Sequence, residues 1–436
     1  MKGKIQVLIA SILAIVFVLS SNARALESWQ APFDTTANKE LVDSFVSLED
    51  ALKLVAAENP AFRSFSFQLK AAKSNLKQAG LWSNPELGAE FEEFGWDAPG
   101  FRESEFSISV AQEFEFFGQR GARKNAARVQ IDATRLQVKL SAFDLFLETK
   151  QRFYALAHAQ QNVTLSRKSV ELAKEIVTNI NYRLERGAAL QSELLLARLE
   201  EQRAQLALDQ TTQDAIATEA VLVSLWSGKP LGLKASTEAE PDFTPLLDKL
   251  THLANQVDST RNIIQLQSNA EILRAEKAVA ITEARPTVTL SGGFKRSEAD
   301  NSKSFLFGVS LPIPFFNRNQ GTKESIDAQL RSLEYDIEQS RIEAISNTRS
   351  HTILLMNLIH RHAVLDSLLL PTAEEAYRIL QNTYEAGRLP YTQLLEAERI
   401  LNDLNFEHND LLLAIQEQVI KLESLTGVVL LLEREN

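Results

Sequence analysis

Six histidines are the side chains in this sequence with the best-suited chemistry for binding a metal ion. His360 and His362 differ by two positions, so on a helix their rings point about 200° apart and cannot chelate one ion together. The others stand alone in the sequence: His158, His252, His351 and His408. There is also no cysteine to complete a site. We therefore expect no specific metal site and no cofactor.

Catalytic motifs are absent from the sequence as well. It contains no arrangement typical of serine or cysteine nucleophiles and no glycine-rich phosphate loop. We therefore do not expect an enzyme. What the sequence does contain is a set of carboxylates and hydroxyls that alternate with apolar residues.

This alternation marks two pairs of strands. It begins after Asn84-Pro85 and again after Arg285-Pro286, which predicts hairpins at 85–114 and 286–313. Each strand holds about ten residues, the length of a tilted strand that crosses a hydrocarbon layer. A soluble hairpin with one buried face would alternate in the same way. Paired aromatic residues at the strand ends, and Trp96 in the opposite turn, favour a membrane barrel.

We expect the polar members of the alternation to face water inside such a barrel. These positions are Glu86, Glu90, Glu92, Ser107, Ser109, Thr287, Thr289 and Ser291. In an assembly of three chains each glutamate would form a ring of three carboxylates, which favours cations. The alternative is that the carboxylates only keep the interior wet.

The first 25 residues have the features of a secretory signal peptide. Lys2 and Lys4 precede an apolar run, and Ala23-Arg24-Ala25 supplies a small-residue cleavage site. Its removal leaves 43 basic and 57 acidic side chains, a net charge of −14, so nucleic acid is not expected as a partner. No later stretch offers the roughly 20 apolar residues of a membrane helix. Any crossing of a bilayer should therefore use strands.

Two stretches of the chain 200 residues apart are similar to each other. Gly187 with Leu194 and Leu195 recurs as Gly387 with Leu394 and Leu395. A repeat this long indicates one duplicated domain rather than a solenoid. We expect a leader at 26–47, a first copy at 48–228, a linker at 229–243, a second copy at 244–427 and a tail at 428–436.

Each hairpin is followed by a very long helical stretch. Residues from about 121 to 186 and from about 322 to 386 contain almost no glycine or proline, and some 65 helical residues would extend roughly 100 Å. Both stretches end at a glycine and restart at once, which predicts helical hairpins with tips near Gly187 and Gly387. The spacing of leucines in the last helix is typical of a coiled coil.

Four strands cannot close a barrel in lipid. Both edges of such a sheet would carry unpaired backbone groups, which a hydrocarbon layer does not tolerate. Several copies of the chain are therefore required, although the residues alone do not fix their number.

Four segments of the sequence carry a resemblance to the TolC-like outer membrane efflux proteins. They are Asn84-Pro85-Glu86-Leu87, Glu115-Phe116-Phe117-Gly118-Gln119-Arg120-Gly121-Ala122-Arg123-Lys124, Leu311-Pro312-Ile313-Pro314-Phe315-Phe316-Asn317, and Tyr384-Glu385-Ala386-Gly387. Each segment is weak alone, but their order and 200-residue spacing are specific. The resemblance extends from Ser47 to Gly427.

This resemblance implies a mainly α fold with a small β part. Three duplicated chains would form a 12-stranded outer-membrane β-barrel continued by a long periplasmic α-helical barrel. The implied partners are two further copies in a homotrimer, a periplasmic adaptor (membrane fusion protein), an inner-membrane efflux pump and outer membrane lipid. The protein would lie in the outer membrane of a Gram-negative bacterium, extend into the periplasm and act as a passive conduit.

The resemblance also places a gate at the helical tips, where the family is closed by inward-bent hairpins held through polar contacts. The corresponding positions here are Gly187, Ser192, Glu193, Tyr384, Gly387, Gln393 and Glu396. Glu396 falls where the family carries an acidic ring. Gln393 lies one turn earlier, at a position that is often acidic in the family, and Leu389 stands where a gating arginine would be expected. These departures argue against a strong two-ring cation trap and an arginine lock. They leave a hydrogen bond between Glu193 and Tyr384 as the lock to test, with ordinary surface polarity as the alternative.

The sequence from Asn84 to Leu87 and from Gly118 to Arg123 is most similar to the branch of the family that serves cobalt-zinc-cadmium pumps. We therefore expect export of divalent heavy-metal cations with an RND-type pump. One alternative is a channel of the same architecture for drugs or organic solutes. The other is a secreted coiled-coil scaffold or adaptor without a pore, which would not need the alternating strands.

Overall fold

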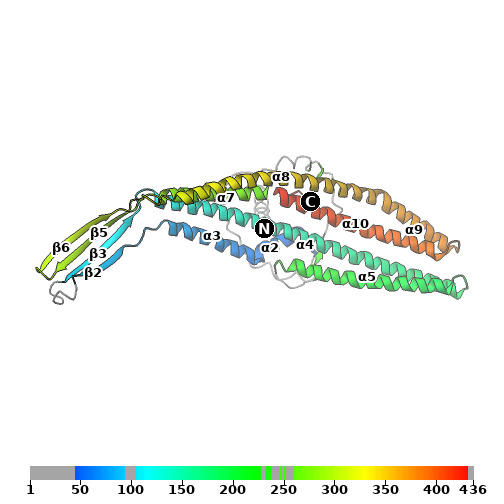
Figure 1. The fold of residues 1–436 in the computed structure, drawn as a ribbon. Coiled ribbons are helices and arrows are strands. Elements are labelled where there is room, and N and C mark those ends of the chain that lie inside the picture. The colour runs from blue at the N-terminus through cyan, green and yellow to red at the C-terminus, as the bar shows by residue number, and fades with distance from the viewer. Residues whose placement is uncertain are drawn as a thin grey trace, which may run out of the picture. The chain divides into compact units, whose positions relative to one another are not determined.

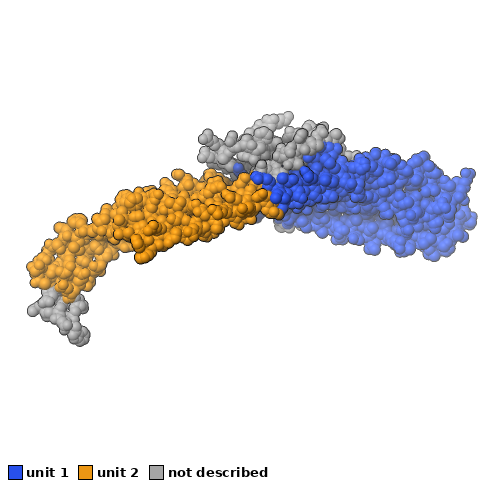
Figure 2. Space-filling view, turned by 45° about the horizontal axis from the view of Figure 1, so that its top comes forward, with its two compact units in different colours: residues 1–63, 139–261, 341–436 blue, residues 64–138, 262–340 orange. Residues whose placement is uncertain are grey.

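The computed structural model describes residues 45–93, 104–226, 232–236, 243, 246–247, 250 and 260–430. The expected signal peptide, most of the leader and linker, Trp96, His252 and the end of the tail lie outside these residues. The chain divides into two units (Figure 2). Unit 1 draws on residues 1–63, 139–261 and 341–436, and unit 2 on residues 64–138 and 262–340.

Unit 2 contains one antiparallel sheet. Its strands are β2 (Glu86–Glu92), β3 (Glu105–Phe114), β5 (Val288–Ser297) and β6 (Ser302–Ser310), in the order β2-β3-β5-β6 (Figure 1). The two hairpins, one from each copy of the duplication, join through β3 and β5. Each strand alternates polar and apolar residues, so the sheet has one polar and one apolar face.

The helices of unit 2 begin or end beside the strand ends. They are α3 (Pro60–Ala79), the start of α4 (Gln119–Glu185), α7 (Arg261–Glu283) and the start of α8 (Gln320–Val364). Arg120 donates from Nε to the Gly80 carbonyl at 2.7 Å and stacks over Trp82 at 4.8 Å. The Gln119 amide donates to the carbonyls of Arg285 and Pro286, both at 3.3 Å. The Gln119 contacts thus join the strand–helix junction of the first copy to that of the second.

The first helix of unit 1 is α2 (Leu48–Glu58), which Ser47 caps. The Ser47 hydroxyl accepts from the Asp50 amide, and the Asp50 carboxylate accepts from the Ser47 amide. The apolar pattern after Ser47 indicates one continuous helix to about Trp82, but the structure has two helices, α2 and α3. The helix breaks at Asn59 because Pro60 disfavours helical backbone in the residue before it.

Two helical hairpins form the rest of unit 1. The first joins α4 to α5 (Gln191–Val223), and the second joins α9 (Leu370–Glu385) to α10 (Tyr391–Thr426) (Figure 1). Gly187 and Gly387 turn the chain with φ of 71° and 72°, a left-handed conformation that glycine adopts without steric cost.

A short π-helical segment, η3 (Leu365–Leu369), separates α8 from α9. Pro371 follows it and has no amide hydrogen to donate to the preceding turn. The wider turn takes up this defect, and the Leu370 amide bonds back to the Leu365 carbonyl. Residues 320 to 385 therefore stay helical through the proline.

Among the residues that the structure describes, one helical stretch is apolar enough to cross a membrane by length and composition alone. It lies within Gln320–Glu385 and has a mean hydropathy of 1.4, with 22% of the window buried. The expectation that no later window would pass was wrong. The whole helical run has 66 residues, far more than the roughly 20 that span a bilayer. Several of its apolar side chains are exposed.

A fully buried ion pair joins the two copies in the core of unit 1. Lys150 of α4 donates to both oxygens of Glu423 of α10 at 2.8 and 2.9 Å, and both side chains are 0% exposed. Glu423 also accepts from the Leu430 amide at 2.8 Å. A short parallel pair, β1 (Phe45–Val46) with β4 (Lys234–Ala235), lies beside the apolar cluster that includes Val46 and Leu233.

Glu423→Ala should destabilise the purified protein strongly, by about 3–5 kcal/mol, because it leaves the Lys150 ammonium buried without its counter-ion. The exposed Glu417→Ala on the same helix is the matched control. The double variant Lys150→Met, Glu423→Leu should recover much of the loss. Thermal melts followed by circular dichroism measure the effect, and equal midpoints for Glu423→Ala and the control would contradict it.

Candidate functional site

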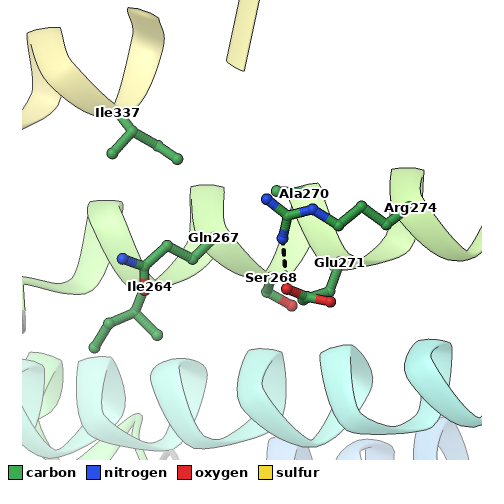
Figure 3. Close-up of a pocket in the computed structure, with 7 residues that line it drawn as sticks. All are labelled: Ile264, Gln267, Ser268, Ala270, Glu271, Arg274 and Ile337. Atoms are coloured by element: carbon green, nitrogen blue, oxygen red, sulfur yellow. Dashed lines mark hydrogen bonds and ion pairs between the residues drawn. The ribbon is translucent and has the colours of Figure 1, made fainter. Parts of the chain in front are cut away.

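An open hollow lies between α7 and α8 (Figure 3). Its volume is about 530 Å³. The lining residues are Ile264, Gln267, Ser268, Ala270, Glu271, Arg274 and Ile337. Glu271 is ion-paired with Arg274 at 2.6 Å. The lining holds no histidine or cysteine, and its one carboxylate, Glu271, is engaged by Arg274, so it offers no activated nucleophile.

Histidines that are distant in the sequence come together in unit 1. The rings of His362 on α8 and His408 on α10 lie 4.8 Å apart, and His408 Nε2 is 3.8 Å from Asp366 Oδ1. His408 is isolated in the sequence, and only the packing of α8 on α10 brings it beside His362. Among the described residues no group of three or more metal-ligating side chains is placed to hold an ion.

The strand positions predicted to face water share one face of the sheet. The register pairs Glu90 with Ser107 and Gly88 with Ser109, and it pairs Ser291 with Ala111. Thr287 immediately precedes β5 and has the same parity. The opposite face is apolar, and there Phe305, Phe307 and Val309 are 77%, 89% and 75% exposed.

A lysine on the polar face was missed. Lys295 of β5 lies opposite Ser107 and forms ion pairs with Glu92, at 3.0 Å, and with Glu105. Glu92 is therefore not the free carboxylate that the sequence suggested, whereas Glu86 and Glu90 have no such partner in the described structure. The parity of Lys295 with Thr289 and Ser291 was the signal that could have revealed it.

The two hairpin tips pack against each other in unit 1. Their apolar contact comprises Ile176 and Ile180 of α4, Leu194 and Ala197 of α5, Tyr377 and Tyr384 of α9, and Tyr391, Leu394 and Leu395 of α10. The four helices thus share one small core where each hairpin turns. Ser192, Gln393 and Glu396 are exposed at its periphery.

The polar link between the tips is made by Arg183 and not by Glu193. Arg183 Nη1 donates to the Tyr384 carbonyl at 2.8 Å, Nη2 donates to the Ala188 carbonyl at 3.2 Å, and the guanidinium lies 4.4 Å from the Tyr384 ring centre. The Tyr384 hydroxyl is buried without a hydrogen-bond partner. The expected Glu193–Tyr384 hydrogen bond is therefore wrong, because the guanidinium holds the ring and the backbone beside it.

A buried carboxyl beside the tip core also escaped sequence analysis. Glu398 of α10 is 6% exposed, and burial raises its pKa from 4.5 to about 7, with a further increase from the nearby Glu200 carboxylate. The heptad-like spacing of α10 could have indicated burial, because Glu398 falls one turn after Leu394 and Leu395.

Comparison with known proteins finds relatives of this chain among efflux and metal-resistance proteins. The model of the family described as outer membrane efflux protein matches residues 51–228 and 258–428. The cobalt-zinc-cadmium resistance protein CzcC of Cupriavidus metallidurans is 26% identical over 358 residues, covering 82% of this chain and 84% of that protein. The nickel-cobalt-cadmium resistance protein NccC of Alcaligenes xylosoxydans xylosoxydans is 25% identical, covering 65% of this chain and 64% of that protein.

The fold agrees with that of a solved structure. The crystal structure of CusC has a TM-score of 0.71 and 17% identity, and it covers 88% of this chain and 93% of that chain. That structure shows conformational changes that accompany folding and transmembrane channel formation of CusC. The family match spans most of the present sequence from α2 to the end of α10. The chain therefore belongs to the outer membrane efflux protein family.

Proposed function

We propose that this protein is the outer membrane channel of a tripartite efflux system and a passive conduit for divalent heavy-metal cations. The observation that carries the proposal is the sheet. Its apolar face is exposed, its opposite face is polar, and within the described residues β2 and β6 each pair on one side only. A lone sheet of this kind would leave backbone groups unpaired in lipid, so a barrel built from several chains is the stable solution.

A homotrimer is the assembly that we infer. Three copies would give 12 strands with lipid around their apolar face. Exposed apolar side chains also lie along α8, the π-helical segment η3 and α9: Ile342, Ile353, Leu354, Leu368, Leu369 and Ile379. Others lie along α5: Leu195, Leu199, Leu206 and Ile216. Contact between neighbouring copies would bury both sets, which accounts for the apolar helical window without a membrane helix.

Heavy-metal cations are the substrate class that we favour. CzcC and NccC are named for resistance to cobalt, zinc, nickel and cadmium. The polar face of the sheet carries Glu86 and Glu90, which would give a pore of this kind a negative wall. Selection of the metal ion would then belong to the inner-membrane pump, reached through a periplasmic adaptor, and the channel itself would perform no chemistry.

Loss of the protein from its host tests the substrate class. A deletion strain should become sensitive to cobalt, zinc or cadmium salts, and expression of the intact gene should restore growth. The same strain is challenged in parallel with drugs and organic solutes. Sensitivity to those compounds alone would contradict the metal assignment and favour the alternative channel.

Ion selectivity depends on the charges of the polar sheet face. Lys295→Gln should raise the preference for cations, on the order of twofold at about 0.1 M salt, because Glu92 and Glu105 lose their counter-charge. Lys303→Gln removes the same charge from the opposite face and is the control, since β5 and β6 pair Lys303 with Arg296. Reversal potentials of single channels under a salt gradient measure the ratio. Anion selectivity of the unaltered protein would contradict the conduit for cations.

The Arg183 contact should hold the tips closed. Arg183→Ala removes the bond to the Tyr384 carbonyl and the contact with the ring, and it should raise the open fraction roughly tenfold. The exposed Arg198→Ala of α5 is the charge-matched control. Tyr384→Phe should leave conductance unchanged because its hydroxyl makes no hydrogen bond. Conductance in planar bilayers checks all three, and a closed Arg183→Ala channel would contradict this lock.

A further inference from the structure

The tip core contains one carboxyl group that no partner neutralises. Glu398 has no hydrogen bond or ion pair in the described structure and is 6% exposed. Groups from three helices interact with it: Glu200 of α5, Tyr377 of α9, and Tyr391 and Arg399 of α10. Glu175 of α4 and Glu385 of α9 act on Tyr377.

The one cation in this set is already engaged. Arg399 Nη2 lies 2.5 Å from Glu200 Oε1, and Glu200 also accepts from Arg203 at 3.2 Å. The Tyr377 hydroxyl is buried and has no hydrogen-bond partner, so it does not solvate the carboxyl. An ionised Glu398 would therefore be a largely buried negative charge beside the Glu200 carboxylate, which is costly in a packed core.

We propose that Glu398 is a proton-binding latch between the two helical hairpins. With its proton, the side chain is a neutral member of the core formed by α4, α5, α9 and α10. Without its proton, it separates the hairpins, because the carboxylate gains hydration only when the packing loosens. The inference rests on the proposed channel for its effect on conductance, but the change in packing does not depend on a pore.

The direction of the pH dependence follows from linkage. Burial raises the pKa of Glu398 from 4.5 to about 7 in the packed state. Below about pH 4.5 the group is protonated whether or not the tips pack, and packing keeps its full stability. Between these values loosening releases a proton, so packing weakens as pH rises. From pH 5 to pH 8 the ratio of packed to loosened tips should fall about a hundredfold.

Conductance across this range is the first test. The open fraction of the unaltered channel should rise between pH 5 and pH 8. Glu398→Gln should stay near its low-pH value throughout, because the amide keeps the shape of the acid but cannot ionise. Asp403→Asn, an exposed position of the same helix, should retain the pH dependence. An identical pH profile for Glu398→Gln and the unaltered protein would overturn the proposal.

Cross-linking of the tips gives a readout that needs no pore. The chain has no cysteine, so Ala188→Cys with Ala386→Cys introduces one exposed thiol on each tip. Yields of cross-linking within one subunit by a short bismaleimide are compared with and without Glu398→Gln at each pH, which cancels the pH dependence of the thiols. The ratio of the yield with Glu398 to the yield with Glu398→Gln should fall as pH rises. A constant ratio would reject the latch even if the channel conducts, whereas absent conductance with a changing ratio would reject only the conduit.

A second variant guards against misfolding of the first. Glu200→Gln removes the nearest carboxylate and frees Arg399 to face Glu398, so the transition in cross-linking should move to lower pH by about one unit. A transition that stays in place would show that Glu398 is not the titrating group.

Discussion

Unpaired backbone groups at the edges of the four-stranded sheet are the constraint on which the rest of the structure depends. Within the described residues, the backbone groups of β2 and β6 are paired on one side only. The apolar face of the sheet is exposed and would be stable in contact with lipid. Symmetric addition of further chains meets both needs at once. The duplication supplies the means, because each copy contributes one hairpin, and β3 and β5 join the two hairpins without a break.

The same duplication places two helical hairpins in one chain, and here the copies have diverged. Arg183 of the first tip holds the Tyr384 backbone of the second, although the position equivalent to Arg183 in the second copy is Thr383. The buried Glu398 has Arg198 as its counterpart, which is exposed. The link that Arg183 makes is therefore not repeated by the second tip.

Much of the fold could be predicted from the sequence because it consists of long elements with a single period. Alternation over β2, β3, β5 and β6 fixed the polar face, and glycines at 187 and 387 fixed the tips. The helix break at Asn59 and the π-helical turn before Pro371 are local effects of proline that a helical period conceals. The apolar window of Gln320–Glu385 was missed because its charged residues interrupt the run without lowering its mean hydropathy enough.

The sequence by itself determined the class of protein, the two hairpins, the helical hairpins and the family, because these follow from periodicity and from short motifs in a fixed order. Only the tertiary structure decided the polar partners: Lys295 with Glu92, Arg183 with Tyr384, and Lys150 with Glu423. Each pair joins residues more than 200 positions apart in different elements. Such contacts depend on the register and rotation of packed elements. The periodicity of one element does not specify either of them.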